Sequence, residues 1–330
     1  MNASTEPSIF HVRSSRAVIS AGYKLYMSNF KTLFRRTWPF AIGYALVIAL
    51  MMYLLLHNMP QLLAMMELAK QHKAAPGVYG FQAILQLGTI LYYLAGILLT
   101  APVFTCLAEH LQTGTIAPPV KWYQVSAWPM TLRMVCLLLC YYFLTLVISI
   151  AIIIVIGIVL VGVILVAGIK ITSAPITIAV FSILIGIAFL ALYLPLFYTT
   201  YKYLLTPKSR FVPVLKETYK VGLRHWGSIF LVLLMVGIIT QVISSVVILP
   251  YNILAIAITK SVMGVALGDP VGMPDYMGWM SFIVFSIAGF VLAYLHLSVI
   301  FPFYYLYGSI EKQEEEKKEM MPINTNLPQQ

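Results

Sequence analysis

The sequence predicts an all-α fold: a polytopic membrane helical bundle of six transmembrane helices, arranged as three tandem hairpin repeats with interfacial amphipathic helices. Three observations support this prediction. The composition is apolar, six apolar runs have spanning length, and a short aromatic and basic segment recurs every 98 residues. Of the 330 residues, 61% are hydrophobic and 10% are charged, whereas about 25% of the residues of a soluble domain are charged. We therefore expect an integral membrane protein.

The six apolar runs define the expected spans, because about 20 apolar residues cross a hydrocarbon core of about 30 Å. They cover residues 38–57, 83–107, 134–160, 175–200, 227–250 and 279–306. One uncharged stretch, 134–169, is 36 residues long, or about 54 Å as a helix. It could be two short spans split at Gly157 or Gly162. We favour one long tilted helix, because a seventh span would place the basic block 202–224 outside.

The distribution of basic residues predicts the orientation. With six spans and a cytoplasmic N-terminus, 17 of the 21 Lys and Arg residues lie on the cytoplasmic side. The positive-inside rule thus predicts that both termini are cytoplasmic. We expect the bacterial cytoplasmic (inner) membrane. The same rule accounts for the net charge of +10, which therefore does not indicate nucleic acid as a partner.

The recurring segment divides the chain into repeats. Its copies are Tyr23-Lys24-Leu25, Lys121-Trp122-Tyr123 and Tyr219-Lys220-Val221. Each copy is followed by an aromatic residue and then a long apolar run; these aromatic residues are Phe30, Trp128 and Trp226. We expect a polar N-terminal tail (1–16), a membrane domain (17–310) with repeats of about 17–115, 116–210 and 211–310, and a mobile charged C-terminal tail (311–330).

A proline stands near the cytoplasmic end of the second helix of each predicted hairpin: Pro102, Pro195 and Pro302. Proline removes one backbone hydrogen bond and kinks a helix. Proline is also simply common in membrane helices. Because all three stand at a matched depth, we favour a geometry that the three hairpins share.

The segments before spans 1 and 5 predict interfacial amphipathic helices over residues 17–36 and 211–226, in which an apolar stripe alternates with cations. Their cations would attract anionic lipid at about 1 kcal/mol each. Alternatively, they serve only as topology anchors. The candidate lipid-headgroup residues are Lys24, Lys31, Arg35, Arg36, Lys216, Lys220 and Arg224.

The sequence offers little for catalysis or metal binding. It contains no HExxH motif, Walker loop, nucleophile elbow or carboxylate pair. Cys136 and Cys140 share a helix face but have no further ligands nearby in the sequence. His296 is expected to be a hydrogen-bonded interior residue. We therefore expect no catalytic residues, no metal site and no cofactor.

The amphipathic basic lead-ins, the three hairpins and the matched prolines together resemble a known pattern. They are similar to the bacterial six-span proteins grouped with the membrane domain of glycerophosphodiester phosphodiesterases and with the YciC-like family of uncharacterised proteins. The residues that carry the resemblance are Tyr23, Lys24, Phe30, Trp128, Trp226, Pro102, Pro195 and Pro302. Because we expect no soluble catalytic domain in this chain, the resemblance implies a stand-alone membrane domain without inherited catalysis.

Two functions follow from the sequence. The first is a non-enzymatic integral membrane protein that interacts with anionic lipid or scaffolds envelope partners. The second is a transporter or channel for a lipid-like or apolar solute, with the interface between repeats as the pathway. A membrane enzyme ranks third, because it would need a cluster of polar residues at one depth. The expected partners are membrane lipids, other membrane proteins or further copies of the chain.

Overall fold

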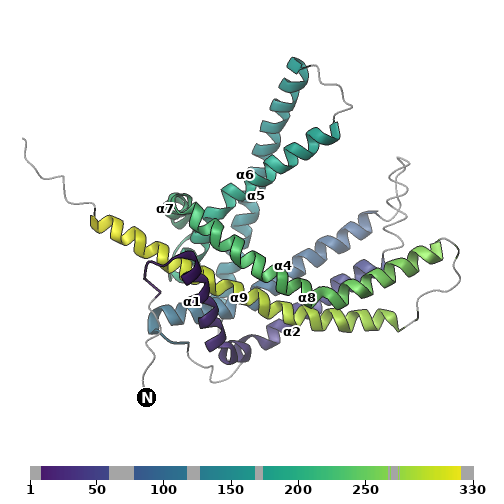
Figure 1. Cartoon of the computed structure of the whole chain (residues 1–330), viewed down its shortest axis with the longest axis horizontal. Coiled ribbons are helices and arrows are strands. Elements are labelled where there is room, and N and C mark those ends of the chain that lie inside the picture. Colours follow the sequence, from purple (N-terminus) through teal and green to yellow (C-terminus); the bar gives the residue numbers. More distant parts are fainter. Residues whose placement is uncertain are drawn as a thin grey trace, which may run out of the picture.

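The structure, a computed structural model, describes residues 9–58, 78–116, 127–167, 174–266 and 276–320, together with Gly268 and Pro274. This part of the chain forms eight helices and no strand (Figure 1). The helices are α1 (Ser15–Ser28), α2 (Phe30–His57), α4 (Val78–Thr113), α5 (Trp128–Ala167), α6 (Ala174–Leu205), α7 (Phe211–Arg224), α8 (Trp226–Ala266) and α9 (Met277–Met320). The second copy of the recurring segment, at Lys121, lies outside the described residues.

Six of the described helices, α2, α4, α5, α6, α8 and α9, are long and apolar enough to cross a membrane. This confirms the predicted all-α membrane bundle. The overlong run from 134 lies in a single helix of 40 residues, α5, which is about 60 Å long. The six helices make three hairpins: α2 with α4, α5 with α6, and α8 with α9.

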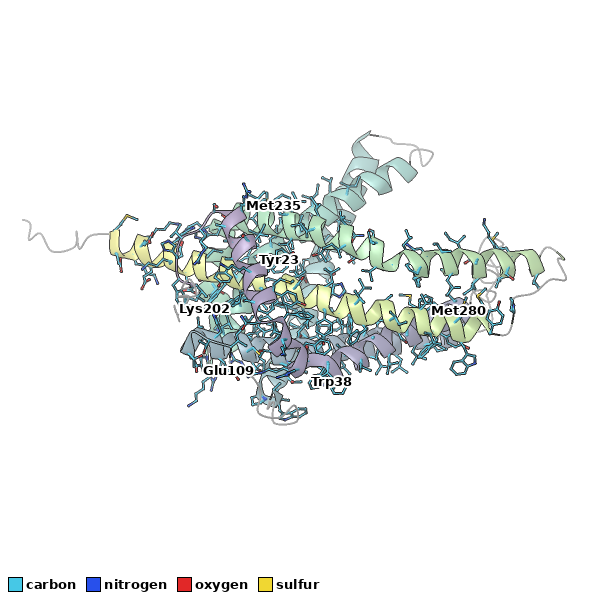
Figure 2. All side chains as sticks on the ribbon, turned by 60° about the horizontal axis from the view of Figure 1, so that its bottom comes forward. Tyr23, Trp38, Glu109, Lys202, Met235 and Met280 are labelled. Atoms are coloured by element: carbon cyan, nitrogen blue, oxygen red, sulfur yellow. The ribbon has the colours of Figure 1, made fainter. Side chains whose placement is uncertain are left out.

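Helix α9 is the centre of the packing. It contacts α1, α2 and α8 extensively, and also touches α4 and α6. From Phe301 to Ile310 every residue of α9 is buried. Figure 2 shows α9 running the length of the molecule, with Glu109 and Lys202 toward one end and Met280 toward the other. The third hairpin therefore supplies the core on which the first hairpin assembles.

Small residues allow α2 and α9 to approach closely. Ala41, Ala45 and Ala49 are spaced by four residues, lie on one face of α2 and are buried. Opposite them, a Cβ added at Gly289 would lie 3.2 Å from the Cα of Ala45. Without a strong hydrophobic drive between helices in lipid, such close contact between backbones is a main source of association.

The hairpin of α5 and α6 extends away from the other long helices in Figure 1. Its first helix, α5, makes few contacts. None of the 18 consecutive residues that form its most apolar stretch is buried, whereas 50% of the corresponding stretch of α4 is buried. Leu139, Phe143 and Ile153 are each more than 60% exposed. These side chains face hydrocarbon if the helix lies in a membrane.

The first hairpin and the third are each preceded by a short helix that ends one residue before the spanning helix. Helix α1 ends at Ser28 and α2 starts at Phe30, with Asn29 as the joint. Helix α7 ends at Arg224 and α8 starts at Trp226, with His225 as the joint. The single amphipathic helix predicted over 17–36 is therefore wrong in extent. The break lies at Asn29, whose backbone leaves the helical conformation (φ −107°, ψ 9°) and whose side-chain amide donates to the Leu25 carbonyl at 3.1 Å.

The long helices start at matched positions. Phe30 is the first residue of α2, Trp128 of α5 and Trp226 of α8. These are the three aromatic positions that the sequence places 98 residues apart. The expected spans started later, because hydropathy marks only the apolar part of each helix.

The short helices cross the second helices at their prolines, where no side chain separates the backbones. A Cβ at Gly22 of α1 would lie 2.5 Å from the Cα of Pro302, and one at Gly222 of α7 would lie 2.6 Å from the Pro195 carbonyl oxygen. The phenol of Tyr26 also donates to the Tyr294 carbonyl at 2.9 Å, and burial raises the pKa of this phenol. The short helices are thus fixed on the bundle.

All three predicted kink prolines lie inside continuous helices: Pro102 in α4, Pro195 in α6 and Pro302 in α9. Pro195 and Pro302 mark the crossing points of α7 and α1. The C-terminal tail is a correction to the prediction: residues 311–320 are not a mobile tail, because α9 continues to Met320. Residues 321–330 lie outside the described part.

Candidate functional site

Exposed cations lie at the start of the first hairpin. Lys24 on α1 and Lys31 and Arg35 on the first turns of α2 are exposed. The buried residues of α1 are Val18, Ile19, Gly22, Leu25 and Tyr26. Lys24 therefore stands off the packed face, as an interfacial helix requires.

Helix α7 carries the second set of cations. Lys216 and Lys220 are exposed, while Phe211, Thr218 and Gly222 of the same helix are buried against the bundle. Two contacts fix this face on α6: the Thr218 and Thr199 hydroxyls lie 2.9 Å apart, and Tyr219 donates to the Leu192 carbonyl at 3.2 Å. Both lysines therefore stay available to an anionic partner.

Arg36 differs from the other candidate residues. Its side chain is only 7% exposed, and its guanidinium pairs with the Glu109 carboxylate at 3.0 Å. It also lies 3.1 Å from the Cys106 sulfur. The ion pair joins α2 to α4 within the first hairpin. Arg36 is therefore bound within the bundle and does not belong with the exposed cations.

Arg224 is also engaged, by the C-terminal part of α9. Its guanidinium pairs with Glu314 at 2.8 Å, and the His225 imidazole lies 2.8 Å from the other oxygen of the same carboxylate. One turn earlier, Glu311 accepts from Lys202 at 2.7 Å and from the Tyr198 phenol at 2.8 Å. The two carboxylates thus hold the end of α9 against α6 and the joint between α7 and α8.

Arg133 was not among the predicted site residues, yet it holds the end of α6. Its guanidinium donates to the Tyr203 carbonyl, to the Thr206 carbonyl at 2.9 Å and to the Ser209 hydroxyl at 2.8 Å. It also lies over the Tyr203 ring, 4.7 Å from its centroid. These carbonyls lie at the end of α6, where the last carbonyls of a helix lack partners within the helix. The positive-inside count placed Arg133 on the cytoplasmic side but could not indicate these contacts.

His296 is hydrogen-bonded as the sequence predicted, but the expected interior position is wrong, because the residue is exposed at the surface of the bundle. Its Nδ1 lies 3.2 Å from the Tyr44 hydroxyl, which lies 3.2 Å from the Tyr92 hydroxyl. This chain links α9, α2 and α4. Among the described residues, no group of three or more His, Cys, Asp or Glu side chains could hold a metal ion.

An apolar cavity lies between the second hairpin and helices α4 and α9. Its volume is about 370 Å³. The wall is mainly aromatic and aliphatic, and consists of Phe104, Tyr141, Tyr193, Leu196, Phe197, Thr200, Tyr201, Val299, Ile300 and Phe303. Five of these residues are buried and five are half-buried. The sequence did not predict this cavity, because its wall combines residues from four helices.

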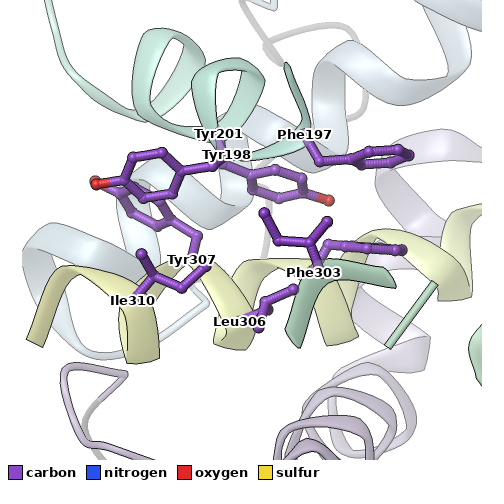
Figure 3. Close-up of a pocket in the computed structure, with 8 residues that line it drawn as sticks. Phe197, Tyr198, Tyr201, Phe303, Leu306, Tyr307 and Ile310 are labelled. Carbon is purple, nitrogen blue, oxygen red and sulfur yellow. The ribbon is translucent and has the colours of Figure 1, made fainter. Parts of the chain in front are cut away.

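A stacked pair of rings separates this cavity from a much smaller space toward the end of α9. Figure 3 shows Phe197 and Phe303 beside Tyr198, Tyr201 and Tyr307 along the contact between α6 and α9. The Phe197 and Phe303 rings are stacked with centroids 4.9 Å apart. Both rings line the cavity as well as the smaller space.

The chain was compared with models of protein families, with curated proteins and with solved structures, and none of them matches. The resemblance to the phosphodiesterase membrane domain and the YciC-like family therefore stays a prediction.

Proposed function

We propose that this integral membrane protein is not an enzyme and interacts with anionic lipid of the bacterial cytoplasmic membrane. The observation that carries the proposal is the pair of short helices α1 and α7. Each buries one face against a spanning helix, while Lys24 on α1 and Lys216 and Lys220 on α7 stay exposed just before the next span. Cations in this position gain about 1 kcal/mol each beside an anionic leaflet.

The proposal includes the orientation and the repeats. Both termini would be cytoplasmic, because this orientation places 17 of the 21 basic residues on that side. Three tandem repeats would explain why long helices start at Phe30, Trp128 and Trp226. Membership of the resembled six-span family is part of the same proposal and rests on these positions.

The lipid-binding residues of the proposal are Lys24, Lys31, Arg35, Lys216 and Lys220. Arg36, which is buried, and Arg224, which is exposed but paired, are assigned instead to the ion pairs with Glu109 and Glu314. The proposed role therefore depends on five cations of the predicted seven.

The test replaces these five cations by glutamine and measures lipids retained on the protein by native mass spectrometry from nanodiscs. The discs contain equal amounts of phosphatidylglycerol and phosphatidylcholine. We expect the preference for phosphatidylglycerol to fall by about fivefold for each kcal/mol lost. The control replaces Lys260, which lies outside the set, by glutamine and should retain the preference. An unchanged preference in the five-residue variant would contradict the proposal.

The alternative function is transport of a lipid-like or apolar solute. The observation that favours it is the 370 Å³ cavity between hairpins, since transporters bind their substrates at interfaces between repeats. Movement of a fluorescent lipid between the leaflets of proteoliposomes would distinguish transport from binding alone.

A further inference from the structure

We propose that the cavity between α4, α5, α6 and α9 binds one acyl chain of a membrane phospholipid. This inference deepens the proposed lipid interaction and rests on it for the identity of the ligand. It adds a site for the hydrocarbon part of the lipid, whereas the exposed lysines concern only the headgroup.

The position of the cavity selects a ligand from the bilayer. All four helices that line it have the length and apolarity of membrane spans. The half-buried wall residues Tyr141, Tyr193, Phe197, Thr200 and Val299 mark its open side. Since the outer surface of α5 is apolar and exposed, a lipid chain is the molecule that reaches this opening from the membrane.

The chemistry of the wall selects hydrocarbon over a polar solute, because each wall hydroxyl already has a partner. Tyr141 contacts the Leu196 carbonyl at 3.1 Å and the Thr200 hydroxyl at 2.6 Å. Tyr201 donates to the Ile300 carbonyl at 2.8 Å. The Tyr193 hydroxyl is bonded to Thr145. The cavity therefore presents ring faces and methyl groups to its occupant.

The size of the cavity suits a hydrocarbon chain that enters from its open side. An apolar cavity of about 150 Å³ stays dry and binds a benzene-sized molecule. The cavity here is about 370 Å³, so it has room for several consecutive methylene groups of a chain.

Charge near the cavity suits an anionic headgroup. The Phe211 ring, at the start of α7, lies 5.6 Å from the ring of the wall residue Tyr141. Lys216 is exposed and follows Phe211 by five residues, about 7.5 Å along the helix axis. A phospholipid chain in the cavity would thus leave its phosphate in reach of α7.

The experiment uses full-length protein in nanodiscs that contain phosphatidylglycerol with a diazirine on one acyl chain. After illumination, mass spectrometry locates the crosslinks. We expect them to concentrate on wall residues of α6 and α9. Val299→Trp fills the cavity and should reduce these crosslinks by at least about fivefold, because overpacking excludes the chain. The matched control, Val242→Trp, changes a valine that is 62% exposed and should leave them unchanged.

A second variant keeps the test decisive if Val299→Trp fails to fold. Tyr193→Leu enlarges the cavity and should increase the crosslinks. Crosslinks spread evenly over the exposed spans, or unaffected by both substitutions, would overturn the proposal. Repeating the labelling with phosphatidylcholine separates the two proposals. If both lipids crosslink to the wall residues equally, only the proposal that the exposed lysines select the headgroup is overturned. If phosphatidylglycerol is preferred but the crosslinks do not concentrate on the wall, only the cavity proposal is overturned.

Discussion

Helices α2 and α5 open the first and second hairpins and have similar hydropathy, yet they are buried very differently. The most apolar windows have mean hydropathies of 2.2 and 2.7, but 28% of the α2 window is buried and none of the α5 window. Apolar character explains why both helices enter a membrane. It does not determine whether a helix then packs against protein or lipid.

The residues at the contacts explain the difference. Helix α2 presents Ala41, Ala45 and Ala49 to α9, whose Gly289 brings the backbones together. Helix α5 presents large exposed side chains such as Ile150 and Ile153 instead. In lipid, large apolar side chains gain little by leaving the hydrocarbon, whereas small ones permit close backbone packing. The comparison therefore predicts where substitutions matter.

The largest effect is expected at the ion pair of the first hairpin. Glu109→Gln removes the charge that faces the buried Arg36 guanidinium. Breaking a buried pair from one side costs about 3 kcal/mol, so the free energy of unfolding in mixed micelles titrated with SDS should fall by that amount. Arg36→Met should cost less, because Glu109 is 41% exposed and can be hydrated. Equal costs would contradict this asymmetry.

The next effect tests the close contact directly. Gly289→Val places methyl groups against Ala45, and overpacking costs about 1–3 kcal/mol. Gly186→Val makes the same change on α6, where an added Cβ has no heavy atom within 4 Å. SDS unfolding should show a loss for the first variant only. A similar loss for both would mean that the second hairpin is packed as tightly as the first.

A smaller effect is expected inside the second hairpin, where Tyr141 links α5 to α6. Tyr141→Phe removes the hydrogen bonds to Leu196 and Thr200, worth about 1 kcal/mol in total. Hydrogen exchange should become faster in α5 and α6 and stay unchanged in α9. The matched control is Tyr142→Phe, because the Tyr142 side chain is 69% exposed.

The smallest effect is expected on the exposed face of α5. Ile150→Ala and Ile153→Ala shorten side chains that are 50% and 68% exposed. Surface substitutions of this kind stay within about 0.5 kcal/mol, so the SDS midpoint should not move. A clear destabilisation would indicate that α5 packs against another protein or another copy of the chain.

Several elements could be predicted from the sequence. The six spans follow from apolar length, and α5 was expected as one helix because the charge rule disfavoured a seventh span. The hydrogen bonding of His296 was expected too, although the residue is exposed and not interior. Predictions failed for charged residues whose ion-pair partners are distant in the sequence. Arg36 was grouped with the exposed cations, and residues 311–320 were expected to be mobile, although Glu311 and Glu314 hold this part of α9 in place.

The sequence by itself determined the membrane class, the number of spans and the 98-residue spacing, because hydropathy and repeats are properties of neighbouring residues. Only the tertiary structure decided which cations remain exposed, which helix lies at the centre and where the cavity forms. Arg36 and Glu109 are 73 positions apart, and the cavity wall combines residues of α4, α5, α6 and α9. Such contacts depend on shape and distance between helices, which no single segment encodes.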